Sequence, residues 1–108
     1  MNYWLVLLLA GIFEIGFTTC LKLSDGFTKL WPTVAFAICA LASFGLLTLS
    51  LKGIPMGTAY AVWTGIGAFG TAIVGMMFFK DPSTTMRMVF LFGIIGCIIG
   101  LKFVAPEG

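Results

Sequence analysis

The sequence predicts an all-α integral membrane protein with four transmembrane helices per subunit, and two observations lead to this prediction. Sixty per cent of the 108 residues are hydrophobic and only 9% are charged. A soluble domain carries about 25% charged residues, and a small one leaves much of its surface in water, so lipid is the expected solvent. The chain also contains four apolar stretches, each long enough to cross a hydrocarbon core of about 30 Å at about 1.5 Å per residue.

Short polar breaks separate these stretches. Ser24-Asp25-Gly26 is a typical turn, and Pro32 suits the first turn of a helix. Two further breaks lie at 52–55 and 80–83, and each contains a proline. Barrel strands would alternate apolar and polar residues, whereas these segments are continuously apolar, so helices are the predicted spanning elements. We therefore expect one domain over residues 1–108, with helices at about 3–21, 32–51, 56–79 and 85–104.

The basic residues are almost balanced between the two ends of the predicted bundle. Four spans place both termini on one side, together with Lys52 and Lys102. The opposite side carries the remaining four basic residues, Lys22, Lys29, Lys80 and Arg87. Because the positive-inside rule reads such differences and this one is small, the chain is expected to be able to insert both ways round. The basic residues form no cluster, so nucleic acid is not an expected partner.

Residues for metal or enzymatic chemistry are not apparent in the sequence. There is no histidine, and the spacings of Cys20, Cys39 and Cys97 match no zinc or redox motif. We interpret these cysteines as small packing residues in helices. An enzyme would need a positioned acid or base with a second group, and no such pair is visible. We expect neither a metal, nor a cofactor, nor enzymatic activity.

Glu14 is the strongest candidate for a functional residue, because it lies about halfway along the first predicted helix. The other acidic residues, Asp25, Asp81 and Glu107, fall in loops or in the tail. A carboxylate at membrane depth costs about 2.5–3.5 kcal/mol on insertion scales, and such residues usually mark the path of an ion or substrate. A carboxyl group that binds a proton and a cation in turn is the basis of proton-coupled antiport. The structural alternative is a protonated glutamic acid that bridges two helices.

Helical spacing sets the neighbours of Glu14. Gly11 and Thr18 lie one turn away on either side, and Phe17 lies three residues on. Gly11 is expected to leave room for a ligand. The Thr18 hydroxyl has two interpretations, since it can donate to the Glu14 carboxylate or back to the Glu14 backbone carbonyl.

The third predicted helix carries an aromatic pair followed by glycines. Tyr60 and Trp63 lie three residues apart and share a face, where aromatic rings attract cations by up to about 2 kcal/mol when desolvated. We predict that both line a substrate pocket. The alternative, an anchor at the membrane interface, fits Tyr60 better than the deeper Trp63. Gly65, Gly67 and Gly70 follow, and glycines in such a row predict a hinge.

Polar and small residues in the second and fourth helices complete the candidate set. Ser43 is interpreted either as part of the pocket or as a locally bonded serine. Gly93, Gly96 and Gly100 share one face of the fourth helix, called here the glycine face, and this pattern allows helices to approach closely. It predicts a dimer interface, with packing inside the subunit as the alternative. Lys102, near the end of this helix, is expected to extend to the membrane surface.

Over residues 4–102 the chain closely resembles the small multidrug resistance family of bacterial exporters. Three motifs carry the resemblance: Gly11-Ile12-Phe13-Glu14, the stretch 57–67 that reads GTAYAVWTGIG, and Gly100-Leu101-Lys102. Within them, the run WTGIG at 63–67, together with Ser43 and the last motif, is similar to the guanidinium-exporter branch. The quaternary-ammonium branch usually has a different residue after the tryptophan.

The resemblance implies an antiparallel dual-topology dimer in the bacterial inner membrane. It implies proton-coupled export of small organic cations, guanidinium-type compounds and/or quaternary ammonium ions. Glu14 would be the shared site for proton and cation, Tyr60 and Trp63 would line the pocket, and Ser43 would belong to the hydrogen-bond network around the glutamate. Residues 65–70 would bend the third helix, and the glycine face would hold the dimer.

One residue departs from the guanidinium-exporter pattern. These exporters typically carry tryptophan three residues after the membrane glutamate, where this chain has Phe17. Phenylalanine has no N–H group with which to fix the carboxylate. Because guanidinium is a planar cation best bound by a carboxylate of fixed orientation, the change is expected to weaken selectivity for guanidinium and to favour larger apolar cations or another organic amine.

Other functions stay open from the sequence alone. The chain could be a small dual-topology ion channel, which a dependence of flux on a pH gradient would distinguish from an exchanger. It could also be one subunit of a heteromeric multidrug exporter, with a sister subunit supplying what this one lacks. A purely structural subunit of a larger membrane complex would have no need for Glu14, Tyr60 and Trp63.

Overall fold

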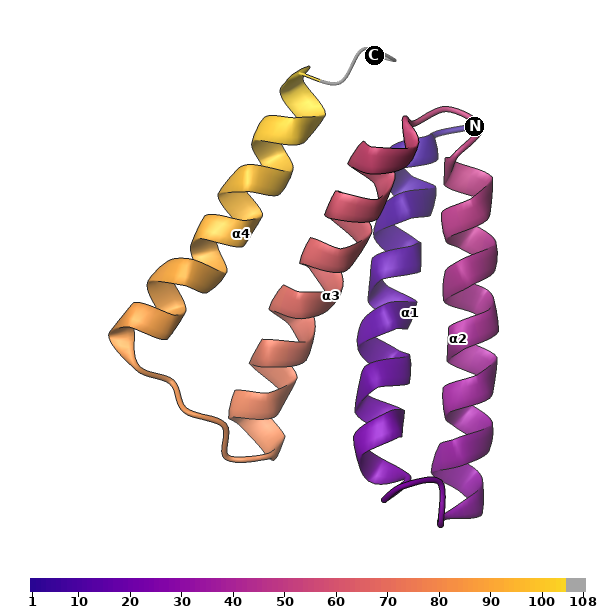
Figure 1. Ribbon diagram of the computed structural model, residues 1–108, viewed down its shortest axis with the longest axis vertical. Helices are drawn as coiled ribbons and strands as arrows, with labels where there is room; N and C mark the ends of the chain where they lie inside the picture. The colour runs from indigo at the N-terminus through magenta and orange to yellow at the C-terminus, as the bar shows by residue number, and fades with distance from the viewer. Residues whose placement is uncertain (105–108) are drawn as a thin grey trace.

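Four helices account for nearly the whole chain in the computed structural model, which describes residues 1–104 (Figure 1). Each helix is long and apolar enough to cross a membrane, which confirms the predicted all-helical class. The bounds differ from the expected ones by two residues at most. The helices are α1 (Tyr3–Leu23), α2 (Leu30–Ser50), α3 (Met56–Phe78) and α4 (Thr85–Val104). Glu107, expected in the tail, lies outside the described residues.

A side-chain cap explains where α1 begins, and the tolerance of a first helical turn for proline allows α2 to start two residues before the expected Pro32. Asn2 caps α1, because its Oδ1 accepts from the backbone N–H groups of Trp4 at 3.1 Å and Leu5 at 3.2 Å. Helix α2 starts at Leu30, which places Pro32 inside the first turn. The amides of a first turn have no partner within the helix, so a proline there removes no hydrogen bond.

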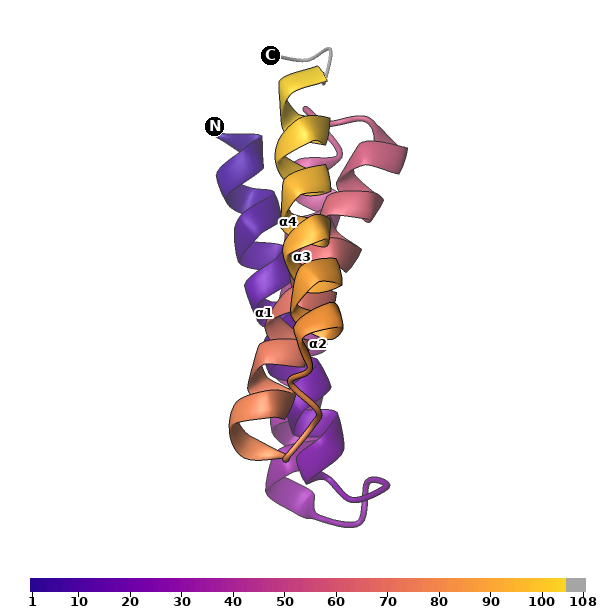
Figure 2. The same cartoon turned by 90° about the vertical axis from the view of Figure 1, so that its left-hand side faces the viewer.

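The four helices do not form a symmetric bundle. Helix α1 packs against both α2 and α3, and α3 also touches α2 along a short stretch. Within residues 1–104, the backbone of α4 lies close to that of α3 alone and is farther from the other two helices (Figures 1 and 2). The molecule measures 43 × 34 × 17 Å, so it is thin in one direction. The start of α1 and the end of α4 lie at the same end of the bundle, as an even number of spans requires (Figure 1).

The buried core lies between α1 and α3, toward the end that holds the N-terminus. Its members are six apolar residues: Leu7, Ala10, Ile54, Ala59, Val62 and Trp63. Elsewhere the surface is largely apolar, as lipid-facing helices require. Helix α4 contributes a single buried residue, Leu91. The fold of one subunit therefore rests on α1, α2 and α3.

Candidate functional site

Glu14 lies where α1 crosses α3, opposite Gly67. A Cβ atom added at Gly67 would overlap the Glu14 carboxyl group, so the absence of a side chain there makes room for the carboxylate. The Oε1 atom of Glu14 is buried and has no hydrogen-bond partner among residues 1–104. Because buried polar atoms are nearly always hydrogen-bonded, this oxygen is suited to a ligand or to a group from another subunit.

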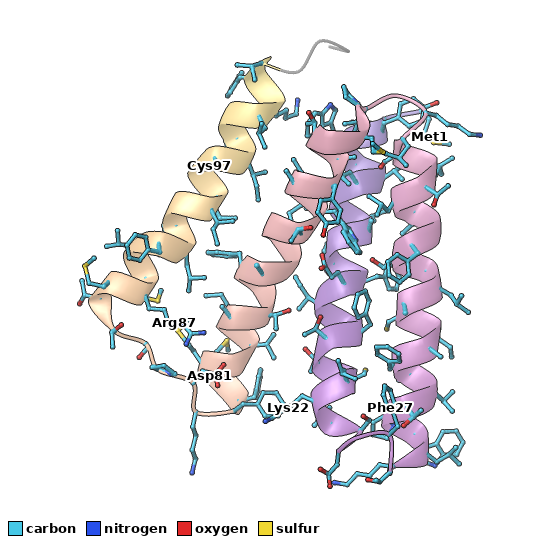
Figure 3. The ribbon with its side chains drawn as sticks, viewed as in Figure 1. Met1, Lys22, Phe27, Asp81, Arg87 and Cys97 are labelled. Carbon is cyan, nitrogen blue, oxygen red and sulfur yellow. The ribbon has the colours of Figure 1, made fainter. Side chains whose placement is uncertain are left out.

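A groove of about 360 Å³ runs from Glu14 toward the α3–α4 loop. Helix α1 provides Glu14 and Thr18, α3 provides a face of small residues, and the loop end provides Asp81 and Arg87. The small residues of α3 are Thr64, Gly67, Ala68, Thr71 and Ala72. Lys22, Asp81 and Arg87 gather at this end of the molecule, opposite Met1 (Figure 3). The groove therefore connects the membrane carboxylate to a charged surface.

The structure decides between the two interpretations of Thr18. Its hydroxyl donates back to the Glu14 carbonyl, with Oγ1 2.9 Å from the carbonyl oxygen. It does not donate to the carboxylate. The Thr18 oxygen still lines the groove, and with its proton engaged it offers only lone pairs to a ligand.

Ser43 forms a long-range network rather than a local bond. Its hydroxyl donates to the carbonyl of Ala10 at 2.6 Å and accepts from the indole N–H of Trp63 at 2.9 Å. The serine is fully buried. Since Ala10 precedes Glu14 by one helical turn, the network reaches the backbone beside the glutamate and links three helices. The carboxylate itself is not part of it within residues 1–104.

Removing the Ser43 hydroxyl should destabilise the subunit. Ser43→Ala leaves the Trp63 N–H buried without an acceptor, and we expect a loss of about 1–2 kcal/mol, the range that model peptides give for one interhelical hydrogen bond in membranes. Reversible unfolding in detergent measures it. Ser50→Ala is the matched control, because the hydroxyl of that buried serine donates to the Leu47 carbonyl of its own helix. Equal losses in the two variants would contradict a bridging role for Ser43.

The aromatic residues predicted to line the pocket, Phe17, Tyr60 and Trp63, form a continuous row together with Phe44. The ring of Phe17 stacks on Phe44 at a centroid distance of 5.9 Å, and Phe44 lies 5.5 Å from Trp63. Tyr60 extends the row, 5.9 Å from Trp63, and is 60% exposed. Phe17 also meets Phe36 edge-on at 5.9 Å. In the single subunit this row packs among α1, α2 and α3, and it does not line the groove at Glu14.

Glycines that were expected to leave room for a ligand or to form a hinge are packed against side chains of neighbouring helices. The room expected beside Gly11 is filled by Ile66, because a Cβ there would overlap that side chain. At Gly70 a Cβ would likewise overlap Ile15 of α1, and at Gly65 it would lie 2.9 Å from Ile98 of α4. Helix α3 is continuous through these glycines. Their hinge role stays a prediction, and in this conformation they let neighbouring helices approach.

The glycine face of α4 is free in the subunit. A Cβ added at Gly93, Gly96 or Gly100 would meet no atom of residues 1–104 within 4 Å. Packing of this face inside the subunit, the alternative raised by the sequence, is therefore not found. Lys102, on the same helix, has its Nζ 5.3 Å from the ring centroid of Trp4. This side-chain contact joins the end of α4 to the start of α1, although the backbones of these two helices are not close.

Sequence reasoning missed Thr64, Thr71, Asp81 and Arg87 as groove residues. Thr64 and Thr71 lie two helical turns apart on the face that includes Gly67, so their spacing was a usable signal. Asp81 was interpreted only as a residue of a polar break. Nothing in the sequence indicates that its carboxylate folds back onto α3.

Comparison with known proteins agrees with the membrane architecture. Residues 2–95 match the family described as Small Multidrug Resistance protein. A guanidinium exporter of Proteus vulgaris is 44% identical over 99 residues, which cover 92% of this chain and 95% of the relative. Guanidinium exporters of Yersinia pestis and Escherichia coli (strain K12) are 43% and 42% identical, again over 92% of this chain and over 95% and 94% of the relatives.

Proposed function

The chain belongs to the Small Multidrug Resistance family, and from this premise we propose that it exchanges protons for small organic cations at Glu14. Its relatives are named as guanidinium exporters, which are transporters and not enzymes. The chain is accordingly a small-cation exporter with four membrane spans in the bacterial inner membrane. The proton coupling, the role of Glu14 and the dimer are the parts that we propose.

The observation that carries the proposal is the unpartnered carboxylate oxygen. Glu14 Oε1 is buried at the inner end of a groove and finds no donor among residues 1–104. A carboxylate in this position is stabilised either by taking up a proton, which removes its charge, or by accepting hydrogen bonds from a cation. Because one carboxylate serves both ligands, each displaces the other, and this competition couples their movements in opposite directions.

The same oxygen favours cations that carry N–H groups. Guanidinium-type compounds present several donors in a plane, which a carboxylate accepts in pairs. A quaternary ammonium ion has no N–H group and would leave Oε1 without a hydrogen bond. We therefore propose guanidinium-type cations as the preferred substrates and quaternary ammonium ions as weaker ones.

We further propose that two subunits in opposite orientations form the transporter. A Cβ added on the glycine face of α4 would meet no atom of residues 1–104 within 4 Å, and the backbone of α4 lies close to α3 alone within these residues. Small residues on a lipid-exposed face favour close helix pairing. The nearly even division of basic residues between the two ends supports insertion both ways round.

Transport in proteoliposomes tests the function. Purified protein is reconstituted, and currents are recorded on addition of guanidinium, methylguanidinium, tetramethylammonium or tetraphenylphosphonium. We expect saturable currents with the first two cations and weaker ones with the others. A pH gradient should also drive uptake of guanidinium against its own gradient, because protons and cation share a site.

Each alternative function gives a different pattern. Currents that persist without dependence on the pH gradient would identify a channel. Currents with the quaternary ions alone would reverse the proposed substrate order. If no cation gives either a current or pH-driven uptake and the protein is a folded dimer, the homomeric exporter is wrong, and co-reconstitution with a sister subunit tests the heteromeric one.

Phe17→Trp is expected to change the balance among these substrates. The indole would take a place now held by a ring that stacks on Phe44 and meets Phe36 edge-on. An N–H group three residues after Glu14 would add a donor near the carboxylate, which should raise the ratio of guanidinium to tetramethylammonium current by about threefold or more. Phe17→Tyr, also aromatic but without an indole, is the comparison. An unchanged ratio in Phe17→Trp would show that this position does not act on selectivity.

A further inference from the structure

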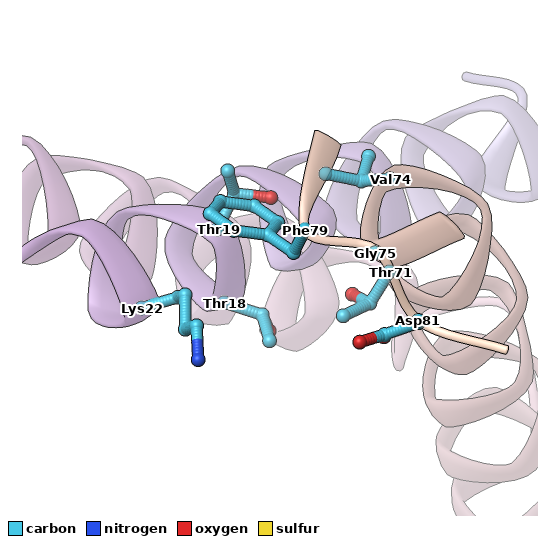
Figure 4. Close-up of a pocket in the computed structure, with 8 residues that line it drawn as sticks. All are labelled: Thr18, Thr19, Lys22, Thr71, Val74, Gly75, Phe79 and Asp81. Atoms are coloured by element: carbon cyan, nitrogen blue, oxygen red, sulfur yellow. The ribbon is translucent and has the colours of Figure 1, made fainter. Parts of the chain in front are cut away.

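A second groove adjoins the one at Glu14, at the end of the molecule that holds Lys22, Asp81 and Arg87 (Figures 3 and 4). We propose that this second groove is an outer binding site for a donor-bearing organic cation, formed by Asp81, Phe79, Thr18 and Thr71. Lys22 lines this groove and Arg87 pairs with Asp81, so both side chains compete with such a cation. This outer site rests on the proposed function, since its ligand is the transported cation on its way to or from Glu14.

The two grooves are continuous. Thr18, Thr71 and Asp81 line both of them. The outer groove has a volume of about 210 Å³ and continues past Phe79 to Lys22. Figure 4 shows Thr18, Thr71 and Asp81 around the same space, with the Phe79 ring beside them. A cation that leaves Glu14 along Thr18 and Thr71 therefore reaches Asp81 without leaving the groove.

The backbone holds the Asp81 carboxylate in this place. Lys80 has a φ of 60°, in the left-handed region, which turns the chain back toward α3. The Asp81 N–H then donates to the Gly75 carbonyl at 3.1 Å. A Cβ added at Gly75 would overlap the Asp81 carboxylate, so the glycine lets the acid lie against the helix. Asp81 is thus positioned by its loop and not merely exposed on it.

Two basic side chains, Lys22 and Arg87, contact the two groups that we propose to bind the organic cation, the Phe79 ring and the Asp81 carboxylate. The ammonium of Lys22 lies over the Phe79 ring, 6.0 Å from its centroid, the outer limit of a cation–π contact. The Arg87 Nη2 lies 3.9 Å from Asp81 Oδ2, which is an ion pair but too long for a hydrogen bond. Both contacts are loose. An organic cation that hydrogen-bonds the carboxylate has closer contacts available than those it displaces.

The polar lining offers acceptors to such a ligand. The Thr18 proton is engaged with the Glu14 carbonyl, so its oxygen presents lone pairs to both grooves. Four charged groups line the joined grooves, two carboxylates and two cations: Glu14, Asp81, Lys22 and Arg87. The negative and positive charges balance. Removing a carboxylate should therefore make the joined grooves less attractive to cations, and removing a basic side chain should make them more attractive to cations.

Thiol labelling tests the outer site without any need for transport. Cys20, Cys39 and Cys97 are replaced by alanine, and Thr71→Cys places one reporter where the grooves meet. The protein is kept in detergent, where both ends of every molecule are accessible. The labelling rate of the reporter cysteine is measured with two methanethiosulfonate reagents, a cationic one that bears trimethylammonium and an anionic one that bears sulfonate. Thr18→Cys is a second reporter in case the first variant does not fold.

The two charge variants should change the labelling in opposite directions. Asp81→Asn should lower the ratio of cationic to anionic labelling by about threefold or more, and Arg87→Gln should raise it by a similar factor. Guanidinium at millimolar concentration should slow labelling, and Asp81→Asn should weaken that protection. Asp25→Asn is the matched control, because it removes a carboxylate from the other loop at the same end, outside both grooves.

The results separate this proposal from the proposed function. A reporter that does not react, or a ratio that changes equally in Asp81→Asn and Asp25→Asn, would overturn the outer site even if transport is intact. Charge-dependent labelling with guanidinium protection would support the site even if the proteoliposomes carried no current. In that case the binding groove would stand and the proposed exchange would fail.

Discussion

Glu14→Gln should abolish cation-dependent current, down to the level of protein-free liposomes. Glutamine occupies the same space opposite Gly67 but carries no charge and takes up no proton in the neutral pH range. It can neither balance a bound cation nor exchange it for a proton, so both halves of the cycle are lost. Substrate-induced currents and pH-driven uptake measure the loss, and size-exclusion chromatography shows whether assembly is preserved.

The shorter acid is the control for this variant. Glu14→Asp keeps a titratable carboxylate but moves it away from Gly67, so we expect reduced rather than absent transport. The fold should survive both changes, because the buried Oε1 of Glu14 makes no hydrogen bond within residues 1–104. Currents of wild-type size in a folded Glu14→Gln variant would show that transport does not pass through this residue.

Gly67→Ala is expected to have the second largest effect. The added methyl group would overlap the Glu14 carboxyl group and force it out of its position in the groove. Displacing a group by about 1 Å from its working geometry can cost about a hundredfold in rate in enzymes, and we expect a loss of transport of about tenfold or more here. Initial rates of guanidinium uptake measure it.

Gly57→Ala separates this steric effect from helix propensity. Gly57 lies in the same helix, and an added Cβ would meet no atom of residues 1–104 within 4 Å. Alanine is favoured over glycine in helices by up to about 1 kcal/mol, so propensity alone would stabilise both variants. Normal transport in Gly57→Ala with loss in Gly67→Ala is the expected pair of results. Equal activity of the two would mean that the carboxylate tolerates displacement.

Most of the fold could be predicted because the membrane restricts it. Continuous apolar segments of sufficient length have only the helix available, and polar breaks with glycine and proline mark their ends. The sequence predicts the start of α2 two residues too late, at Pro32, because proline is also accepted at the third residue of a helix, where its missing N–H has no partner to lose. The sequence does not predict that α4 lies apart from α1 and α2. The spacing of apolar residues reveals the packed face of a helix only when its other faces are polar, and here every face is apolar.

The sequence predicts a site residue when that residue is energetically unfavourable in the membrane. Glu14 stands out in the sequence because a carboxylate in an apolar helix needs a reason, and the groove supplies one. Ser43 and Thr18 have similar chemistry, and only tertiary distances separate the interhelical bond of one from the local bond of the other. Asp81 depends on a backbone turn at Lys80, a residue with no intrinsic preference for positive φ.

The close backbone packing of α4 against α3, and not against α1 or α2 within residues 1–104, has a consequence for biosynthesis. The chain emerges from the ribosome in the order in which its helices are numbered, and α1, α2 and α3 contain nearly all the buried residues. The first three spans can therefore adopt their final packing before the last one is made. Helix α4 then enters the bilayer beside an already folded unit, with its glycine face free to meet a neighbouring chain. In the proposed dimer, folding of each chain and association with its neighbour would thus be separate events, and the second would involve the last helix synthesised.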